Sequence, residues 1–172
     1  VLRLPDVHGT PRWLLAQAAD AAAPALPALA PADWAALEVH SGVVRITAAT
    51  VEQFVPQMVN LELVGGVNFQ KGCYPGQEVV ARSQYRGTLK RRAQLVDSAV
   101  ALAAGQEVFH SADPGQPAGL VALAALRPDG GSSALVELKL AALDGGSLHA
   151  GAADGPALAL GALPYAIPAE QA

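Results

Sequence analysis

The residues of this chain best suited to chemistry lie in one short segment, residues 68–82, which reads NFQKGCYPGQEVVAR. It holds the only cysteine, Cys73, which follows Lys71 and Gly72. A thiol acts as a nucleophile or a metal ligand through its thiolate, and helix N-termini and nearby cations favour that form by lowering the thiol pKa. The chemistry available to Cys73 therefore depends on what the neighbouring sequence places around it.

The residues after the cysteine predict the start of a helix. Tyr74 is the expected N-cap, Pro75 has the fixed backbone angle of a first helical position, and Gln77 can reach back in the manner of a capping box. Glu78 suits the positive end of the helix dipole. With Gly87 as the stop, the helix would run for about 12 residues, and the cysteine would lie one residue before its cap.

Positive charge gathers in the same region. Residues 71–92 contain six basic residues and one acidic residue, whereas the remainder of the chain has five basic and fourteen acidic residues. We expect the six cations to lower the thiol pKa and to attract an anion, such as a polyglutamate tail, a phosphate or a nucleic-acid backbone. Two alternatives stay open, namely a cysteine that packs as a small buried residue and arginines that form an ordinary solvated face. The cations are Lys71, Arg82, Arg86, Lys90, Arg91 and Arg92.

The composition narrows the class of protein. The chain has 172 residues, a formal net charge of −4 and one cysteine, which excludes an internal disulfide and favours a reducing compartment. No stretch is long and apolar enough to span a bilayer, and no secretory signal opens the chain, so we expect a cytoplasmic protein without a membrane partner. The four histidines are too far apart for metal-ligand spacing, so no metal site is predicted.

Two domains are expected around these residues. Residues 1–88 predict an α+β domain with helices over 10–22, opened by Thr10 and Pro11, and over 31–42, closed by Gly42. Residues 89–172 alternate short apolar runs with turn signals such as DPGQP and PDGG, which is typical of a small antiparallel barrel or sandwich. Further short strands are expected at 1–5, 43–47 and 67–69.

The run KGCYPGQEVVARSQYRG, preceded by FVPQMVNLELVGGVNF, closely resembles the signature of the YgfZ family. These are folate-binding proteins that support iron–sulfur cluster maturation or repair, and they belong to the glycine-cleavage T-protein (aminomethyltransferase) superfamily. The resemblance is firm over residues 33–92 and looser elsewhere. It implies a T-protein-like lobe followed by an antiparallel β-barrel. It also implies that the first half of the family's length is absent here, in agreement with a chain that opens on Val1 inside an expected strand.

The resemblance also implies the site residues. The family's motif cysteine maps onto Cys73, and a tryptophan implicated in folate binding maps onto Trp34, which would otherwise be read as a core residue. One departure stands out, because His40 occupies the place of the family's usual acid, and a neutral histidine offers one acceptor nitrogen. Folate recognition would then be weaker or differently arranged. Around a bound tetrahydrofolate the resemblance places Trp34, Lys71, Tyr74, Gln77, Glu78 and Arg82.

Three functions are compatible with these observations. The first is an accessory factor that uses tetrahydrofolate and the Cys73 thiolate to assist iron–sulfur client proteins, and through them tRNA modification. The second is a folate-dependent aminomethyl or one-carbon transferase, although the T-proteins lack the KGCY-x-GQE motif and keep their catalytic aspartate in the region absent here. The third is RNA binding by the basic segment, which ranks last because aromatic residues are scarce there.

Overall fold

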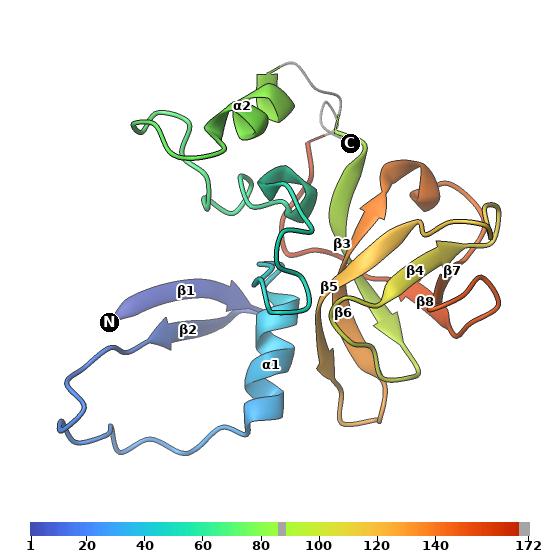
Figure 1. The fold of residues 1–172 in the computed structure, drawn as a ribbon. Coiled ribbons are helices and arrows are strands. Elements are labelled where there is room, and N and C mark those ends of the chain that lie inside the picture. Colours follow the sequence, from blue (N-terminus) through green and yellow to red (C-terminus); the bar gives the residue numbers. More distant parts are fainter. Residues whose placement is uncertain (86–88, 169–172) are drawn as a thin grey trace.

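The computed structural model describes residues 1–85 and 89–168 (Figure 1). A β-barrel forms one side of the molecule, helix α1 packs against it, and a two-stranded hairpin extends from α1 away from the barrel. Helix α2 belongs to a separate segment above the hairpin in this view. In chain order the elements are β1 (Leu2–Val7), β2 (Thr10–Leu14), α1 (Pro31–His40), the 3-10 helix η1 (Pro56–Val59), α2 (Gln77–Tyr85), β3 (Arg91–Ser98), β4 (Glu107–His110), β5 (Gly119–Leu126), β6 (Ser132–Lys139), the 3-10 helix η2 (Leu140–Leu143), β7 (Leu148–Ala150) and β8 (Ala157–Leu160).

The barrel is closed in the strand order β3-β6-β5-β4-β7-β8, and every neighbouring pair is antiparallel. This confirms the α+β class and the small antiparallel barrel, and it excludes the sandwich. The interior is filled by β-branched and other apolar side chains, because alternate residues of each strand point inward. They include Val96, Val108, Val121, Val136 and Leu138.

A second apolar cluster joins α1 to the outside of the barrel. Val39 of α1 packs with Leu135 of β6 and with Ala122 and Leu123 of β5. These two neighbours in β5 share one face because the strand register shifts between Val121 and Leu123, as at a β-bulge. Strand β6 is therefore buried on both faces, one towards the interior and one towards α1.

Helix α1 confirms the helix predicted over residues 31–42. Pro31 stands in the first turn, where its missing N–H costs nothing, and Ser41 forms the C-cap. Gly42 follows with φ of 71°, a left-handed conformation that glycine adopts at no steric cost. Glycine is also required there for space, since a Cβ on Gly42 would lie 2.6 Å from Cε1 of Tyr165.

The helix predicted over residues 10–22 is wrong, because residues 10–14 form strand β2 paired with β1. The turn between the strands is His8-Gly9, and both residues have positive φ, 49° and 76°. Two consecutive positive φ values are the signature of a type I′ hairpin turn. Thr10 and Pro11, which resemble a helix start, instead follow this turn.

Two of the expected short strands are also wrong. Residues 43–47 and 67–69 carry no regular secondary structure, although the strand expected at 1–5 is present as β1. Val44 is nevertheless buried in the cluster beneath α1, so its burial comes from an irregular segment rather than from a sheet. The expected domain boundary at 88/89 and the expected helix stop at Gly87 lie at or within residues 86–88, outside the described residues.

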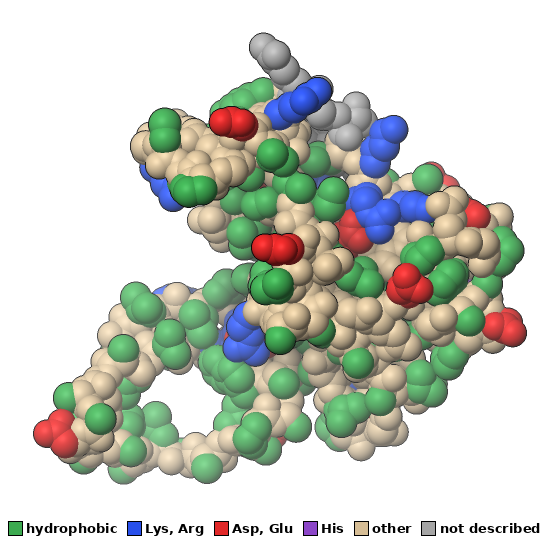
Figure 2. All heavy atoms as spheres, in the orientation of Figure 1, with side chains coloured by type: hydrophobic (Ala, Val, Ile, Leu, Met, Phe, Trp, Pro, Cys, Tyr) green, Lys and Arg blue, Asp and Glu red, His purple; other side chains and the backbone are tan. Residues whose placement is uncertain are grey.

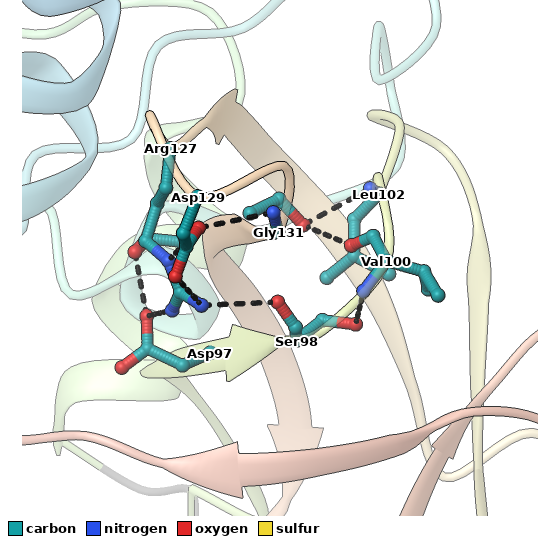
Figure 3. A network of polar contacts seen from close by, with 9 residues as sticks. Asp97, Ser98, Val100, Leu102, Arg127, Asp129 and Gly131 are labelled. Atoms are coloured by element: carbon teal, nitrogen blue, oxygen red, sulfur yellow. Dashed lines mark hydrogen bonds and ion pairs between the residues drawn. The ribbon is translucent and has the colours of Figure 1, made fainter.

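A polar network ties the turn after β5 back to β3 (Figure 3). Arg127 Nη1 donates to Asp97 Oδ1 at 2.8 Å, and Arg127 Nη2 donates to Asp129 Oδ2 at 3.0 Å. Ser133 Oγ donates to the same Asp97 oxygen at 2.5 Å. The Asp97 carboxylate of β3 thus receives donors from both ends of the β5–β6 connection. Within residues 1–85 and 89–168, no helix is both long and apolar enough to cross a membrane.

Candidate ligand pocket and thiol segment

A cavity of about 360 Å³ lies between the β1–β2 hairpin and helix α1. Its size is within the range of small-molecule sites, and its wall is mostly apolar with a few charged groups, which is the usual composition of such sites. The hairpin contributes Leu4, Pro5, Arg12 and Leu14, α1 contributes Trp34 and Glu38, and the following loops contribute Ser41, Val43, Arg45 and Val64.

The pairing of the hairpin explains which of its residues face the cavity. Residues paired across an antiparallel ladder share a face, and Leu4 pairs with Arg12. The next pair, Arg3 and Trp13, therefore points to the other face, where the Arg3 guanidinium lies 5.3 Å from the centroid of the Trp13 ring. The outer face thus carries both Arg3 and Trp13, whereas on the cavity face Arg12 of the hairpin meets Trp34 of α1.

Arg12 is the buried cation of the cavity. Its side chain is 3% exposed, and its Nε donates to the carbonyl oxygen of Pro5 at 3.0 Å. Its Nη1 donates to Glu38 Oε1 at 2.6 Å, and its guanidinium carbon lies 5.3 Å from the centroid of the Trp34 ring. The other oxygen of Glu38 lies 3.6 Å from Nη1 of Arg45, whose side chain is 60% exposed. The Glu38 carboxylate thus lies between two arginines and lines the cavity, and a carboxylate has more acceptor sites than these two contacts occupy.

Of the predicted folate residues, the structure places Trp34 on this cavity. His40 does not line it, because its ring packs beside His8 with 5.0 Å between the ring centroids. The acid that lines the cavity is Glu38, one helical turn after Trp34. Sequence reasoning missed Glu38 and Arg12, although the four-residue spacing on α1 was a usable signal for Glu38.

Cys73 lies in the segment that leads into α2, and its side chain is exposed. This excludes the alternative of a cysteine packed in the core. The backbone turns at Pro75-Gly76, where the Gln77 N–H donates to the Tyr74 carbonyl oxygen at 3.2 Å and Gly76 has φ of 79°. Proline followed by a glycine of positive φ is the signature of a type II turn.

Because of this turn, the helix starts two residues later than expected. Helix α2 begins at Gln77, so the expected N-cap at Tyr74 and first helical residue at Pro75 are wrong. The predicted reach of Gln77 is present, since its Oε1 accepts from the Tyr74 N–H at 3.3 Å. Glu78 lies in the first turn and Arg82 in the last turn of α2, both exposed, as is Lys71. The Lys71 ammonium lies 4.7 Å from the centroid of the Tyr74 ring.

The expected gathering of all six cations at the thiol requires correction. Arg91 is engaged by Glu137 through two hydrogen bonds, and Arg92 is fully buried and paired with Glu62 at 2.5 Å. The buried charges here are Arg92, Glu62 and Glu137, and because a buried charge needs a partner, the two ion pairs tie β3 to residue 62 and to β6. On the face shown in Figure 2, Lys and Arg side chains are spread over the α2 segment and the near edge of the barrel. Arg86 lies outside the described residues.

No family model matches the sequence. In the part of the chain that the structure describes, no group of three or more His, Cys, Asp or Glu side chains is arranged to hold a metal ion. The charged cavity at α1 holds Trp34, and the exposed thiol before α2 is Cys73, so each feature contains one of the residues that the sequence analysis named.

Proposed function

We propose that this protein binds a tetrahydrofolate in the cavity between the hairpin and α1, and that it uses the Cys73 thiolate as an accessory factor for iron–sulfur proteins. The observation that carries the proposal is that Trp34 and Glu38 face one cavity, with Arg12 opposite them. The likeness of residues 33–92 to the YgfZ signature supplies the class of ligand.

The chemistry of the cavity fits a folate. A pterin is flat and carries several N–H donors on one edge, and a carboxylate such as Glu38 can accept two of them. The Trp34 ring offers an aromatic surface next to this acceptor. Arg45 is mostly exposed at the same cavity, where it can meet the carboxylates of a glutamate tail. Glu38 thereby takes the part that the resemblance assigns to an acid at position 40.

The thiol supports the second half of the proposal. Cys73 is exposed, so another protein can reach it. One thiolate cannot hold an iron–sulfur cluster alone, so the remaining ligands come from the client protein, with the cluster as cargo. Gly72 and Gly76 add no side chain beside the sulfur, and a Cβ built on either would contact nothing within 4 Å. The backbone around the thiol is thus open to close approach by a partner.

A client-protection assay tests the proposal. A purified [4Fe–4S] enzyme is exposed to oxidant and then allowed to recover with ferrous iron and a thiol reductant, in the presence of this protein and tetrahydrofolate, and its activity is followed. We expect recovery with the unmodified chain, and recovery at the level of buffer with Cys73→Ser. The serine variant should keep the fold because the side chain is exposed.

The matched pair Trp34→Ala and Trp13→Ala tests the folate half in the same assay. The first removes a cavity residue and should abolish the dependence of recovery on tetrahydrofolate, and the second removes an exposed tryptophan of the opposite face and should preserve it. Full recovery with Cys73→Ser would reject the thiol role, and equal behaviour of the two tryptophan variants would reject the folate role.

A further inference from the structure

A buried polar cluster lies between the ligand cavity and the thiol helix, and it belongs to neither. Its centre is Arg92, whose side chain is fully buried. Arg92 Nη1 donates to the carbonyl oxygen of Gln57 at 2.9 Å and to Glu62 Oε1 at 2.5 Å, and it lies 3.5 Å from Asn60 Oδ1. The segment 57–62 is thus fixed to the first barrel strand by one guanidinium.

The cluster reaches the thiol helix through Gln57. Gln57 Nε2 donates to the carbonyl oxygen of Val80 at 2.7 Å, and both residues are buried. Val80 lies in the first half of α2, seven residues after Cys73, and its side chain is the buried one of the helix. A change in the position of Gln57 would therefore be transmitted to the helix that follows the thiol.

The same cluster reaches the cavity by two routes. Asn60 Nδ2 donates to the hydroxyl of Tyr165 at 3.3 Å, and this hydroxyl donates to the carbonyl oxygen of Gly42 at 2.7 Å. Burial raises the pKa of Tyr165, so the hydroxyl keeps its proton for this bond. Gly42 lies between Ser41 and Val43, which both line the cavity.

The second route is along the chain. Glu62, the partner of Arg92, lies two residues before Val64, which also lines the cavity. Both routes are contiguous series of covalent and hydrogen bonds.

Two acceptor oxygens of the cluster have no hydrogen-bond donor in the part of the chain that the structure describes. Gln57 Oε1 and Glu62 Oε2 are buried, and no donor among the described residues reaches them. A buried acceptor without a donor is unfavourable, so a rearrangement that brought a donor to either oxygen would be favoured by the hydrogen bond it forms. The hydrogen bonds of the Gln57 carboxamide can change. Its Nε2 holds α2 through the Val80 carbonyl oxygen, whereas its Oε1 has no donor among the described residues.

We infer that this cluster couples the cavity to the thiol segment, with Tyr165 and Gln57 as the positioning residues at its two ends. The inference rests on the proposed function for the identity of the ligand, since the coupling would make occupancy by a folate change the placement of the Cys73 segment. Coupling of this kind is reciprocal, so the placement of the segment would also change the affinity for the ligand.

The first test needs no ligand. Amide hydrogen exchange is measured on the full chain and on Tyr165→Phe, with Tyr85→Phe as control. Tyr165→Phe removes one hydroxyl beside Gly42 and Asn60, and we expect exchange of the α2 amides to become about fivefold faster or more, with β6 amides unchanged. Tyr85 lies in α2 itself with its side chain exposed, so its variant should change nothing. Unchanged α2 exchange in Tyr165→Phe would overturn the inference.

The second test uses 5-formyltetrahydrofolate as the probe and the rate of Cys73 alkylation by iodoacetamide as the readout. We expect saturating probe to change this rate about fivefold or more in the unmodified chain, and to leave it unchanged in Gln57→Leu. Gln53→Leu replaces an exposed glutamine four residues before Gln57; it is the matched control and should respond normally.

Calorimetry on the same samples measures binding of the probe, and it thereby distinguishes a failure of the coupling from a failure of the proposed folate binding. Binding of the probe without any change in the alkylation rate would contradict the coupling. Absence of binding would contradict the proposed function, and the hydrogen-exchange test alone would then decide the coupling.

Discussion

The Arg12 guanidinium lies 5.3 Å from the centroid of the Trp34 ring, and this contact joins strand β2 to helix α1 across one cavity. Arg12 also donates to Glu38, so a single buried side chain from the hairpin holds both of the α1 residues to which we assign folate recognition. The hairpin is attached where the ligand would bind, which links the stability of the hairpin to the shape of the site.

Arg12→Met tests this link by removing the buried charge while keeping the bulk. We expect the free energy of unfolding to fall by about 1–3 kcal/mol, because Glu38 loses its closest partner and, among the described residues, keeps only Arg45 at 3.6 Å. Urea denaturation followed by fluorescence measures it. Arg3→Met is the matched control, since Arg3 stacks on Trp13 on the exposed face, and its effect should stay within about 0.5 kcal/mol. Equal effects of the two variants would contradict the assignment of Arg12 as the attachment.

Arg92→Met tests the buried ion pair beneath α2. Glu62, 5% exposed, would be left as an uncompensated buried charge, and we expect a loss of about 3–5 kcal/mol in the free energy of unfolding. The double variant Arg92→Met/Glu62→Met removes both charges and should be clearly more stable than the single one. A double variant as unstable as the single one would show that the pair itself is not what the fold requires.

Gly42→Ala tests the contact between α1 and the C-terminal segment. Alanine at φ of 71° costs about 1–2 kcal/mol, and its Cβ would also collide with the Tyr165 ring. Gly9 has a similar φ of 76°, and a Cβ there would contact nothing within 4 Å. Gly9→Ala should therefore be destabilised by the backbone conformation alone. Thermal denaturation should give a lower Tm for Gly42→Ala than for Gly9→Ala. Equal Tm values would mean that Tyr165 is not packed on Gly42 in solution.

The pH dependence of stability follows from His40. Burial lowers the pKa of His40 below 6.5, the charge of His8 lowers it further, and Asp97 opposes the shift. Below pH 6.5 the unfolded chain takes up a proton at this residue that the folded chain resists. The contribution of His40 to the free energy of unfolding should therefore be constant well above pH 6.5 and fall as the pH drops through 6.5 to about 5. His40→Gln should flatten this decline, which urea denaturation across this pH range measures, and an unchanged decline in this variant would contradict the account.

Much of the fold was predictable from local signals. Pro31 and Gly42 mark the ends of α1, and the turn-punctuated apolar runs after residue 90 mark strands β3 to β6. The hairpin was missed because Thr10-Pro11 is a good helix start, and only the positive φ of His8 and Gly9 turns the chain back. The conformation of the His8-Gly9 turn, and the strand pairing it allows, therefore decided the structure of residues 10–14 against their local helix preference.

The site was predictable only in part for a related reason. Trp34 and Cys73 stand out by residue type, but Arg12 acquires its role from the register of a strand that the sequence did not predict. Gln57 and Tyr165 are 108 positions apart and belong to one cluster through Asn60 and Arg92. Contacts over such separations depend on how the elements pack, and single-sequence patterns carry no record of packing.

Calorimetric titration of the full chain with 5-formyltetrahydrofolate, beside Glu38→Gln and Trp13→Ala, tests the central claim most directly. We predict saturable binding by the unmodified chain and by Trp13→Ala, and at least about tenfold weaker binding by Glu38→Gln, because an amide offers one acceptor in place of two. Binding of equal strength by Glu38→Gln, or no binding by the unmodified chain, would contradict the account.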